Sequence, residues 1–180
     1  MDSGENSYRR YLDGDENAFG ELVELYFDNL TFFINGYVHD VHASEDIAID
    51  AMTELVTHPG RFAFRSSLKT WLFSIGRHKA LGYLKKRRRE LPSPLSDENA
   101  ADCRSLEEDV LAGERQKLLA AAMAELPEEM RYAVHLVYIE GMSYREASKV
   151  LKKSEKQLDN LLMKAKKLLR ERIGKEDAIL

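Results

Sequence analysis

Hydrophobic residues recur every three or four positions along most of the chain, which is the spacing of one face of an α-helix. In the first half, this spacing predicts helices over residues 15–39, from residue 44 to about 58, and from residue 66 or 67 to about 89. Pro59 and Gly60 end the second of these, because proline lacks an amide donor and glycine breaks helices. We find no convincing strand pattern.

The segment from Leu91 to Asn99 has the composition of a linker, with two prolines, two serines and two acids. After it, a helix is predicted to start at Ser105, the first residue of a capping box. Another is predicted to start at Leu126-Pro127, where proline suits the first turn. The sequence therefore predicts an all-α protein with two small helical domains joined by an acidic linker.

Two further capping boxes near the C-terminus begin at Ser143 and Ser154. They predict a helix of about eight residues, a break of two or three, and a final helix from about Glu155 to Arg172 with one apolar stripe. A short helix, a tight turn and a longer helix form the pattern of a helix-turn-helix, whose second helix enters the major groove of DNA.

Charge is distributed in blocks that alternate in sign. The net charge is −11 over residues 1–60, +10 over residues 61–89, −8 over residues 90–130 and +5 over residues 131–180. Two basic blocks separated by an acidic one are typical of a two-part footprint on nucleic acid.

The sequence offers little for catalysis. It has no glycine-rich phosphate loop, no nucleophile elbow and no HExxH motif. His39 and His42 lack a third ligand at metal spacing, which favours solvated or capping roles. Cys103 is the single cysteine, and no apolar run approaches the ~20 residues of a membrane span. We therefore expect a cytoplasmic protein that is not an enzyme and uses no cofactor or metal.

Residues 61–89 are the best candidate for binding nucleic acid, because they carry ten cations and no acid. Cations favoured by the helix dipole account for only two or three of these. Aromatic residues are interleaved with the cations, as in proteins that stack bases of a single strand on rings. Trp71 falls on an apolar stripe and is expected in the core, whereas Phe62 and Phe64, in a predicted loop, are the better stacking candidates.

Taken together, several segments resemble bacterial RNA polymerase sigma factors of the extracytoplasmic-function (ECF) type, over almost the whole chain. The strongest is the run from Ser67 to Arg88, which is similar to the family's Ser-Phe-Arg-Thr-Trp-Leu, Ile-Ala-Arg-Asn and basic Tyr-Leu-Arg-Arg pattern. The other similar segments are Ala43-Ser44-Glu45-Asp46-Ile47-Ala48, Leu126-Pro127-Glu128-Glu129-Met130-Arg131 and Glu140-Gly141-Met142-Ser143-Tyr144-Arg145-Glu146.

The resemblance implies a first domain (sigma region 2, residues 8–90) that binds polymerase and recognises and melts the promoter −10 element. It implies a flexible linker (residues 91–104) and a second domain (sigma region 4, residues 105–174) that reads the −35 element. The implied partners are core RNA polymerase, through its large-subunit clamp helices and its flap, promoter DNA, and an anti-sigma factor that can hold the protein at the membrane.

The candidate site residues divide into three sets. Those for −10 DNA are Arg61, Phe62, Phe64, Arg65, Lys69, Arg77, His78, Lys85 and Arg88. Those for −35 DNA are Lys156, Gln157, Asn160 and Lys164. Those for polymerase form a mixed apolar and acidic patch of Asp46, Ile47, Asp50 and Glu54.

The sequence departs from the family pattern at five positions. Lys152-Lys153 stand where glycine and an apolar residue are usual, so either lysine is strained there or the turn differs. Asp159 and Leu161 replace usual cations on the predicted DNA-facing helix, and Ile49 replaces a usual glutamine. Two alternatives stay open: a sigma-like module that titrates an anti-sigma factor, and a helix-turn-helix regulator that acts without polymerase.

Overall fold

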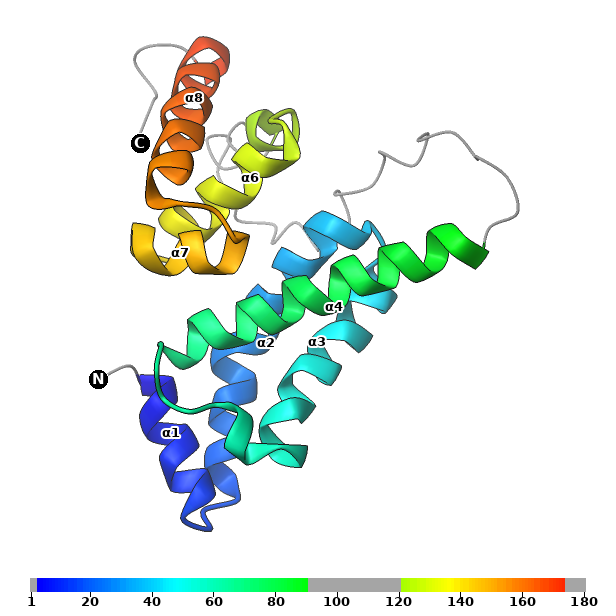
Figure 1. Cartoon of the computed structure of the whole chain (residues 1–180), viewed down its shortest axis with the longest axis vertical. Helices are drawn as coiled ribbons and strands as arrows, with labels where there is room; N and C mark the ends of the chain where they lie inside the picture. Colours follow the sequence, from blue (N-terminus) through cyan, green and yellow to red (C-terminus); the bar gives the residue numbers. More distant parts are fainter. Residues whose placement is uncertain (1–2, 91–120, 174–180) are drawn as a thin grey trace, which may run out of the picture. The chain divides into compact units, whose positions relative to one another are not determined.

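The computed structural model describes residues 3–90 and 121–173. The chain forms two compact units, residues 1–100 and 101–180. Within the described residues both units consist of helices and turns without strands, which confirms the predicted fold class (Figure 1). The predicted linker and the capping box at Ser105 lie outside the described residues.

The described part of the first unit, residues 3–90, contains four α-helices and one short 3-10 turn. They are α1 (Ser3–Leu12), α2 (Asn17–Val38), α3 (Val41–Thr57), the turn η1 (Pro59–Arg61) and α4 (Leu68–Glu90). The last three α-helices match the predicted ones to within three residues at each end. Helix α1 was not predicted, because most of its residues are polar and only its buried Tyr8 belongs to the core.

The core of the first unit lies where α4 packs against α2 and α3 (Figure 1). Its fully buried side chains include Leu22, Leu30, Ile34, Leu55, Leu68, Leu72 and Phe73. Gly76 of α4 allows α2 to come close, since a Cβ atom there would lie 2.9 Å from Leu30 and 3.1 Å from Ile34. Gly76 therefore permits close packing of α2 against the middle of α4.

An aromatic cluster joins α1 to the loop between α3 and α4. The fully buried Tyr8 donates its hydroxyl hydrogen to the carbonyl of Leu55 at 2.9 Å. Its ring centroid lies 5.8 Å from that of Phe62 and 6.1 Å from that of Phe64. Phe62 in turn lies 5.8 Å from Trp71 at the start of α4. These contacts hold the loop against the body of the unit.

The described part of the second unit is a smaller helical body. It contains α6 (Glu128–Val134), a π-helical turn η2 (His135–Ile139), α7 (Tyr144–Leu151) and α8 (Glu155–Ile173), and residues 121–124 are also helical. Both predicted capping boxes are present. Ser143 Oγ accepts from the amide of Glu146 at 3.3 Å, and Ser154 Oγ accepts from that of Gln157 at 3.2 Å.

The turn between α7 and α8 shows whether Lys152 is strained in a turn of the usual geometry or whether the turn differs. Lys152 adopts φ 54° and ψ 44°, the left-handed conformation in which glycine is usual. The amide of Lys153 donates to the carbonyl of Ser148 at 2.9 Å, which closes the turn in the ordinary way. Lysine is therefore strained in an unchanged turn, at a cost of about 1–2 kcal/mol.

Candidate nucleic-acid interface

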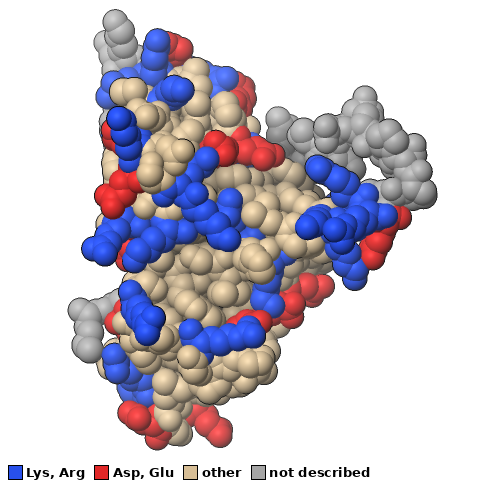
Figure 2. All heavy atoms as spheres, viewed as in Figure 1, with Lys and Arg blue, Asp and Glu red and all other residues tan. Residues whose placement is uncertain are grey.

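The C-terminal end of α4 is a dense cluster of exposed cations, which Figure 2 shows as blue spheres at the far end of that helix. It consists of Lys85, Lys86, Arg87, Arg88 and Arg89, all exposed. Within this cluster, the ammonium group of Lys86 lies 3.9 Å from the carboxylate of Glu90. The predicted contacts Lys85 and Arg88 thus lie on a surface able to meet phosphate groups.

The remaining predicted cations of α4 are less accessible. His78 is exposed, whereas Lys69 and Arg77 are half-buried. The Nε atom of Arg77 is fully buried and has no hydrogen-bond partner among the described residues. Arg65, in the loop before α4, is exposed. The structure therefore leaves Arg61, Arg65, His78 and the end of α4 as the exposed cationic or titratable members of the predicted −10 set.

The expectation that Phe62 is an exposed stacking ring is wrong for this conformation. Phe62 is only 3% exposed, because its ring packs between Tyr8, Phe64 and Trp71. Phe64 is half-buried and adopts φ 55°, and the guanidinium of Arg9 lies 4.0 Å above its ring. One face of Phe64 is thus already covered by a cation from α1.

Two predicted contacts, Arg61 and Glu54, are paired with one another. The guanidinium of Arg61 donates to the carboxylate of Glu54 at 2.5 Å. Lys79 of α4 lies 3.3 Å from the other carboxylate oxygen. The Glu54 side chain is only 17% exposed. Its prediction as an outward polymerase contact is therefore not supported, because the carboxylate faces cations of its own chain.

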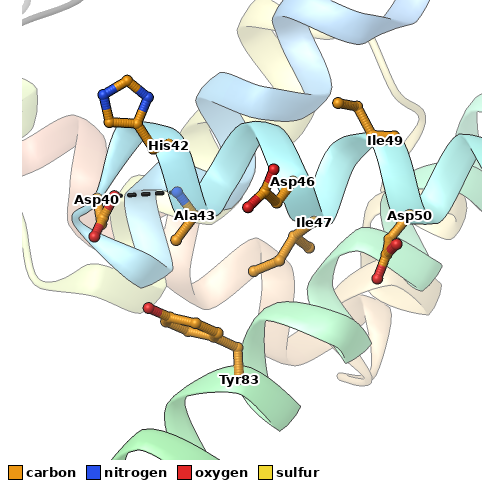
Figure 3. A pocket seen from close by; sticks show the side chains of 8 residues that line it. All are labelled: Asp40, His42, Ala43, Asp46, Ile47, Ile49, Asp50 and Tyr83. Atoms are coloured by element: carbon orange, nitrogen blue, oxygen red, sulfur yellow. Dashed lines mark hydrogen bonds between the residues drawn. The ribbon is translucent and has the colours of Figure 1, made fainter.

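The other predicted residues of α3 line a hollow of about 650 Å³ on the surface of the first unit, beside Tyr83 of α4 (Figure 3). Asp46 is exposed and the Asp50 side chain is 72% exposed, whereas Ile47 is 7% exposed and mainly packs inward. Ile49, which was not among the predicted contacts, is 53% exposed at the rim. The sequence feature that could have identified Ile49 as a contact is its apolar side chain at a position where glutamine is usual.

The start of α3 is fixed at the other end of this hollow. The side chain of Asp40 accepts a hydrogen bond from the amide of Ala43 at 3.1 Å, as an N-cap (Figure 3). His39 ends α2 with φ 54°, and His42 lies 3.5 Å from Glu45. Among the described residues no group of three or more His, Cys, Asp or Glu side chains could hold a metal ion.

Helix α8 presents the predicted −35 residues on its outward side. Lys156, Gln157, Asn160 and Lys164 are all exposed, and Met163 between them is 61% exposed. The Gln157 side chain is already engaged in the helix cap, because its Oε1 accepts a hydrogen bond from the amide of Ser154 at 2.8 Å and completes the capping box. Asn160 is therefore the amide side chain of α8 better placed to read a base edge.

The two departures on α8 differ in position. Leu161 is half-buried, so its only effect on the outer face of α8 is the absence of the positive charge that is usual at this position. Asp159 is exposed, near the phenol of Tyr144 at the start of α7. Burial mainly raises the pKa of Tyr144, and a hydrogen bond with Tyr138 and the charge of Asp159 raise it further.

Comparison with known proteins assigns the family. Residues 22–90 match the family model described as Sigma-70 region 2, and residues 116–169 match that described as Sigma-70, region 4. The RNA polymerase sigma-H factor of Pseudomonas aeruginosa is 30% identical over 148 residues, which cover 77% of each chain. The ECF RNA polymerase sigma factor SigM of Bacillus subtilis is 25% identical over 152 residues, 83% of this chain and 91% of that one.

The chain belongs to the ECF sigma factors. This sigma factor is accordingly a transcription initiation factor and not an enzyme, as the sequence predicted. Solved structures show the same fold. One is the sigma factor RpoE in complex with the anti-sigma factor NepR from Bartonella quintana, with a TM-score of 0.67 and 22% identity over 86% of this chain and 96% of that one. Another is CnrH in complex with the cytosolic domain of CnrY, with a TM-score of 0.62 and 19% identity over 96% and 97%.

Proposed function

We propose that this sigma factor binds core RNA polymerase through the outer face of α3, captures −10 DNA with α4, and reads −35 DNA with α8. The observation that carries the proposal is the separation of charge within the first unit. Acidic side chains with an exposed Ile49 occupy α3, whereas five exposed cations end α4. One helical body therefore offers a surface for a basic protein and another for phosphate.

The polymerase surface consists of Asp46, Ile49 and Asp50, with Ile47 beneath them. An exposed apolar side chain between two carboxylates suits a partner helix that presents basic and apolar residues. The carboxylates contribute orientation and association rate, and Ile49 contributes buried apolar area.

Charge reversal tests this surface directly. We expect Asp46→Lys with Asp50→Lys to weaken binding of core polymerase at physiological salt by more than tenfold, while Asp28→Lys, on an exposed position of α2, leaves it unchanged. Binding is measured by fluorescence anisotropy of the labelled full-length protein titrated with core polymerase. If the α3 and α2 variants bind core polymerase with equal affinity, α3 is not part of the polymerase interface.

The −10 strand is proposed to lie along α4, from Arg65 and His78 to Lys85 and Arg88. These side chains are exposed, and cations along a helix follow a phosphate backbone without reading its sequence. Phe62 joins only if the loop opens and its ring leaves the aromatic cluster.

The second candidate function, titration of an anti-sigma factor without promoter binding, is favoured by one observation. Asp159 is exposed on the outward side of α8, where its charge repels phosphate. The two candidates differ in duplex binding. A −35 promoter function requires the full-length protein in holoenzyme to select −35 sequences from a random library, whereas the titrating module selects none.

We also propose an anti-sigma factor as a partner, because of the two solved structures of similar fold. One of them is a complex with an anti-sigma factor, and the other is a complex with the cytosolic domain of CnrY. We propose a cytoplasmic location, where core polymerase is found, with attachment to the membrane only through such a partner. None of the described helices is long and apolar enough to cross a bilayer.

A further inference from the structure

The carboxylate of Glu54 on α3 is surrounded by cationic or titratable groups from three segments. Arg61 of η1 donates to Oε2 at 2.5 Å, and Lys79 of α4 lies 3.3 Å from Oε1. The imidazole of His58, at the end of α3, lies 3.5 Å from Oε2. Both oxygens of one carboxylate are thus engaged, and they connect α3, the loop after it and α4.

This arrangement keeps Glu54 ionised at neutral pH. A hydrogen bond from Lys79 is the main cause that lowers the pKa of the Glu54 carboxyl, and the charge of Arg61 lowers it further. Exposed ion pairs contribute little, but the side chains of Glu54 and Lys79 are only 17% and 27% exposed. Lys79 also lies 3.8 Å from Asp50, so a second carboxylate of α3 supports the contact.

The two cations held by Glu54 lie beside proposed −10 DNA contacts. Lys79 follows His78 on α4, and Arg61 precedes the loop that contains Arg65. A carboxylate that offers two oxygens to an arginine and a lysine makes the same kind of contacts as a DNA phosphate group. Arg61 and Lys79 are therefore two of the ten cations in residues 61–89 that face Glu54 instead of a free surface for phosphate.

We infer that Glu54 is an internal substitute for phosphate, which occupies Arg61 and Lys79 in the free protein and lowers its affinity for single-stranded DNA. The ion pairs with Glu54 persist when a strand binds, so its phosphates reach these two cations only where the carboxylate is removed. Glu54 thus restrains DNA binding, and in its absence Arg61 and Lys79 become additional phosphate contacts. This inference rests on the proposed role of α4 in −10 DNA binding.

The test measures the salt dependence of binding. Full-length wild-type protein and Glu54→Gln are titrated against a fluorescein-labelled single-stranded oligonucleotide at several salt concentrations, with anisotropy as the readout. Each cation that gains a phosphate steepens the plot of log affinity against log salt by ~0.7, so two released cations steepen it by ~1.4. We expect Glu54→Gln to bind several-fold more tightly at low salt with that steeper slope.

Two controls isolate the mechanism. Asp28→Asn changes the net charge equally from an exposed position on α2 and is expected to leave the slope unchanged. In an Arg61→Gln/Lys79→Gln background, Glu54→Gln is expected to have no effect, because the cations it would release are absent. Fluorescence of Trp71, the only tryptophan of the chain, verifies that each variant is folded.

The outcomes separate this inference from the proposed function. An unchanged slope for Glu54→Gln, with measurable binding by the wild type, overturns the inference alone. A slope that steepens as much for Asp28→Asn also overturns it, since the effect is then general electrostatics. No binding by wild type or Glu54→Gln at low salt contradicts both the inference and the role of α4.

Discussion

Replacement of Phe62 by alanine distinguishes a packing role from a DNA-stacking role. The ring is 3% exposed and lies within 6 Å of three other aromatic rings, those of Tyr8, Phe64 and Trp71, at 5.8, 4.7 and 5.8 Å. Removal of a buried phenylalanine ring costs about 3–5 kcal/mol, from lost transfer free energy and from the cavity left behind. That is a large part of the ~5–15 kcal/mol that stabilises a typical domain.

The assay is urea denaturation of the full-length protein followed by Trp71 fluorescence. This tryptophan lies in the first unit, so its emission reports unfolding of that unit. The matched control is Phe32→Ala, which removes the same ring from a position that is 49% exposed. We expect Phe32→Ala to cost less than about 1 kcal/mol.

Equal, small losses of stability in the two variants would contradict a packing role for Phe62. In that case the Phe62 ring is not packed in solution and is available to stack on bases. A loss of about 3–5 kcal/mol for Phe62→Ala alone supports the packing role.

Three further predictions concern other parts of the molecule. Lys152→Gly should stabilise the second unit by about 1 kcal/mol in urea denaturation followed by circular dichroism, because glycine adopts the left-handed turn without strain. Asn160→Ala should change the −35 sequence that holoenzyme selects from a library, whereas Lys164→Ala should weaken all sequences and reduce the salt slope by about one. A hydrogen bond from Ser7, together with a neighbouring arginine, lowers the pKa of Glu21 below its ordinary 4.5. Its contribution to stability is therefore complete above about pH 4.5 and is lost as the pH falls through the folded pKa, so Glu21→Gln should flatten the acid limb of the stability–pH curve.

Local signals in the sequence predicted most helix boundaries correctly. Capping boxes at Ser143 and Ser154 and the proline before α6 specify their helices through hydrogen bonds between near neighbours, so the chain alone reveals them. At Lys152 the sequence left two alternatives open, a strained lysine or a different turn, and the structure has the strained lysine.

Tertiary partners explain what the sequence could not predict. Helix α1 is mostly polar, yet its Tyr8 packs against the loop and helps to bury Phe62. Without α1 the loop looks exposed, which is why Phe62 was interpreted as a stacking ring. Likewise, Glu54 and Lys79 are 25 residues apart, so neither helical spacing nor charge counting reveals that they pair.

Transcription in vitro shows whether this protein directs core polymerase to promoters. Core RNA polymerase from the source bacterium is incubated with fragmented genomic DNA, with and without the full-length protein, and the 5′ ends of the run-off transcripts are sequenced. We predict new transcripts with discrete starts that share −10 and −35 sequences and that disappear with Asp46→Lys/Asp50→Lys. Transcripts identical to those of core polymerase alone, despite stable binding of the protein to core, would contradict the account.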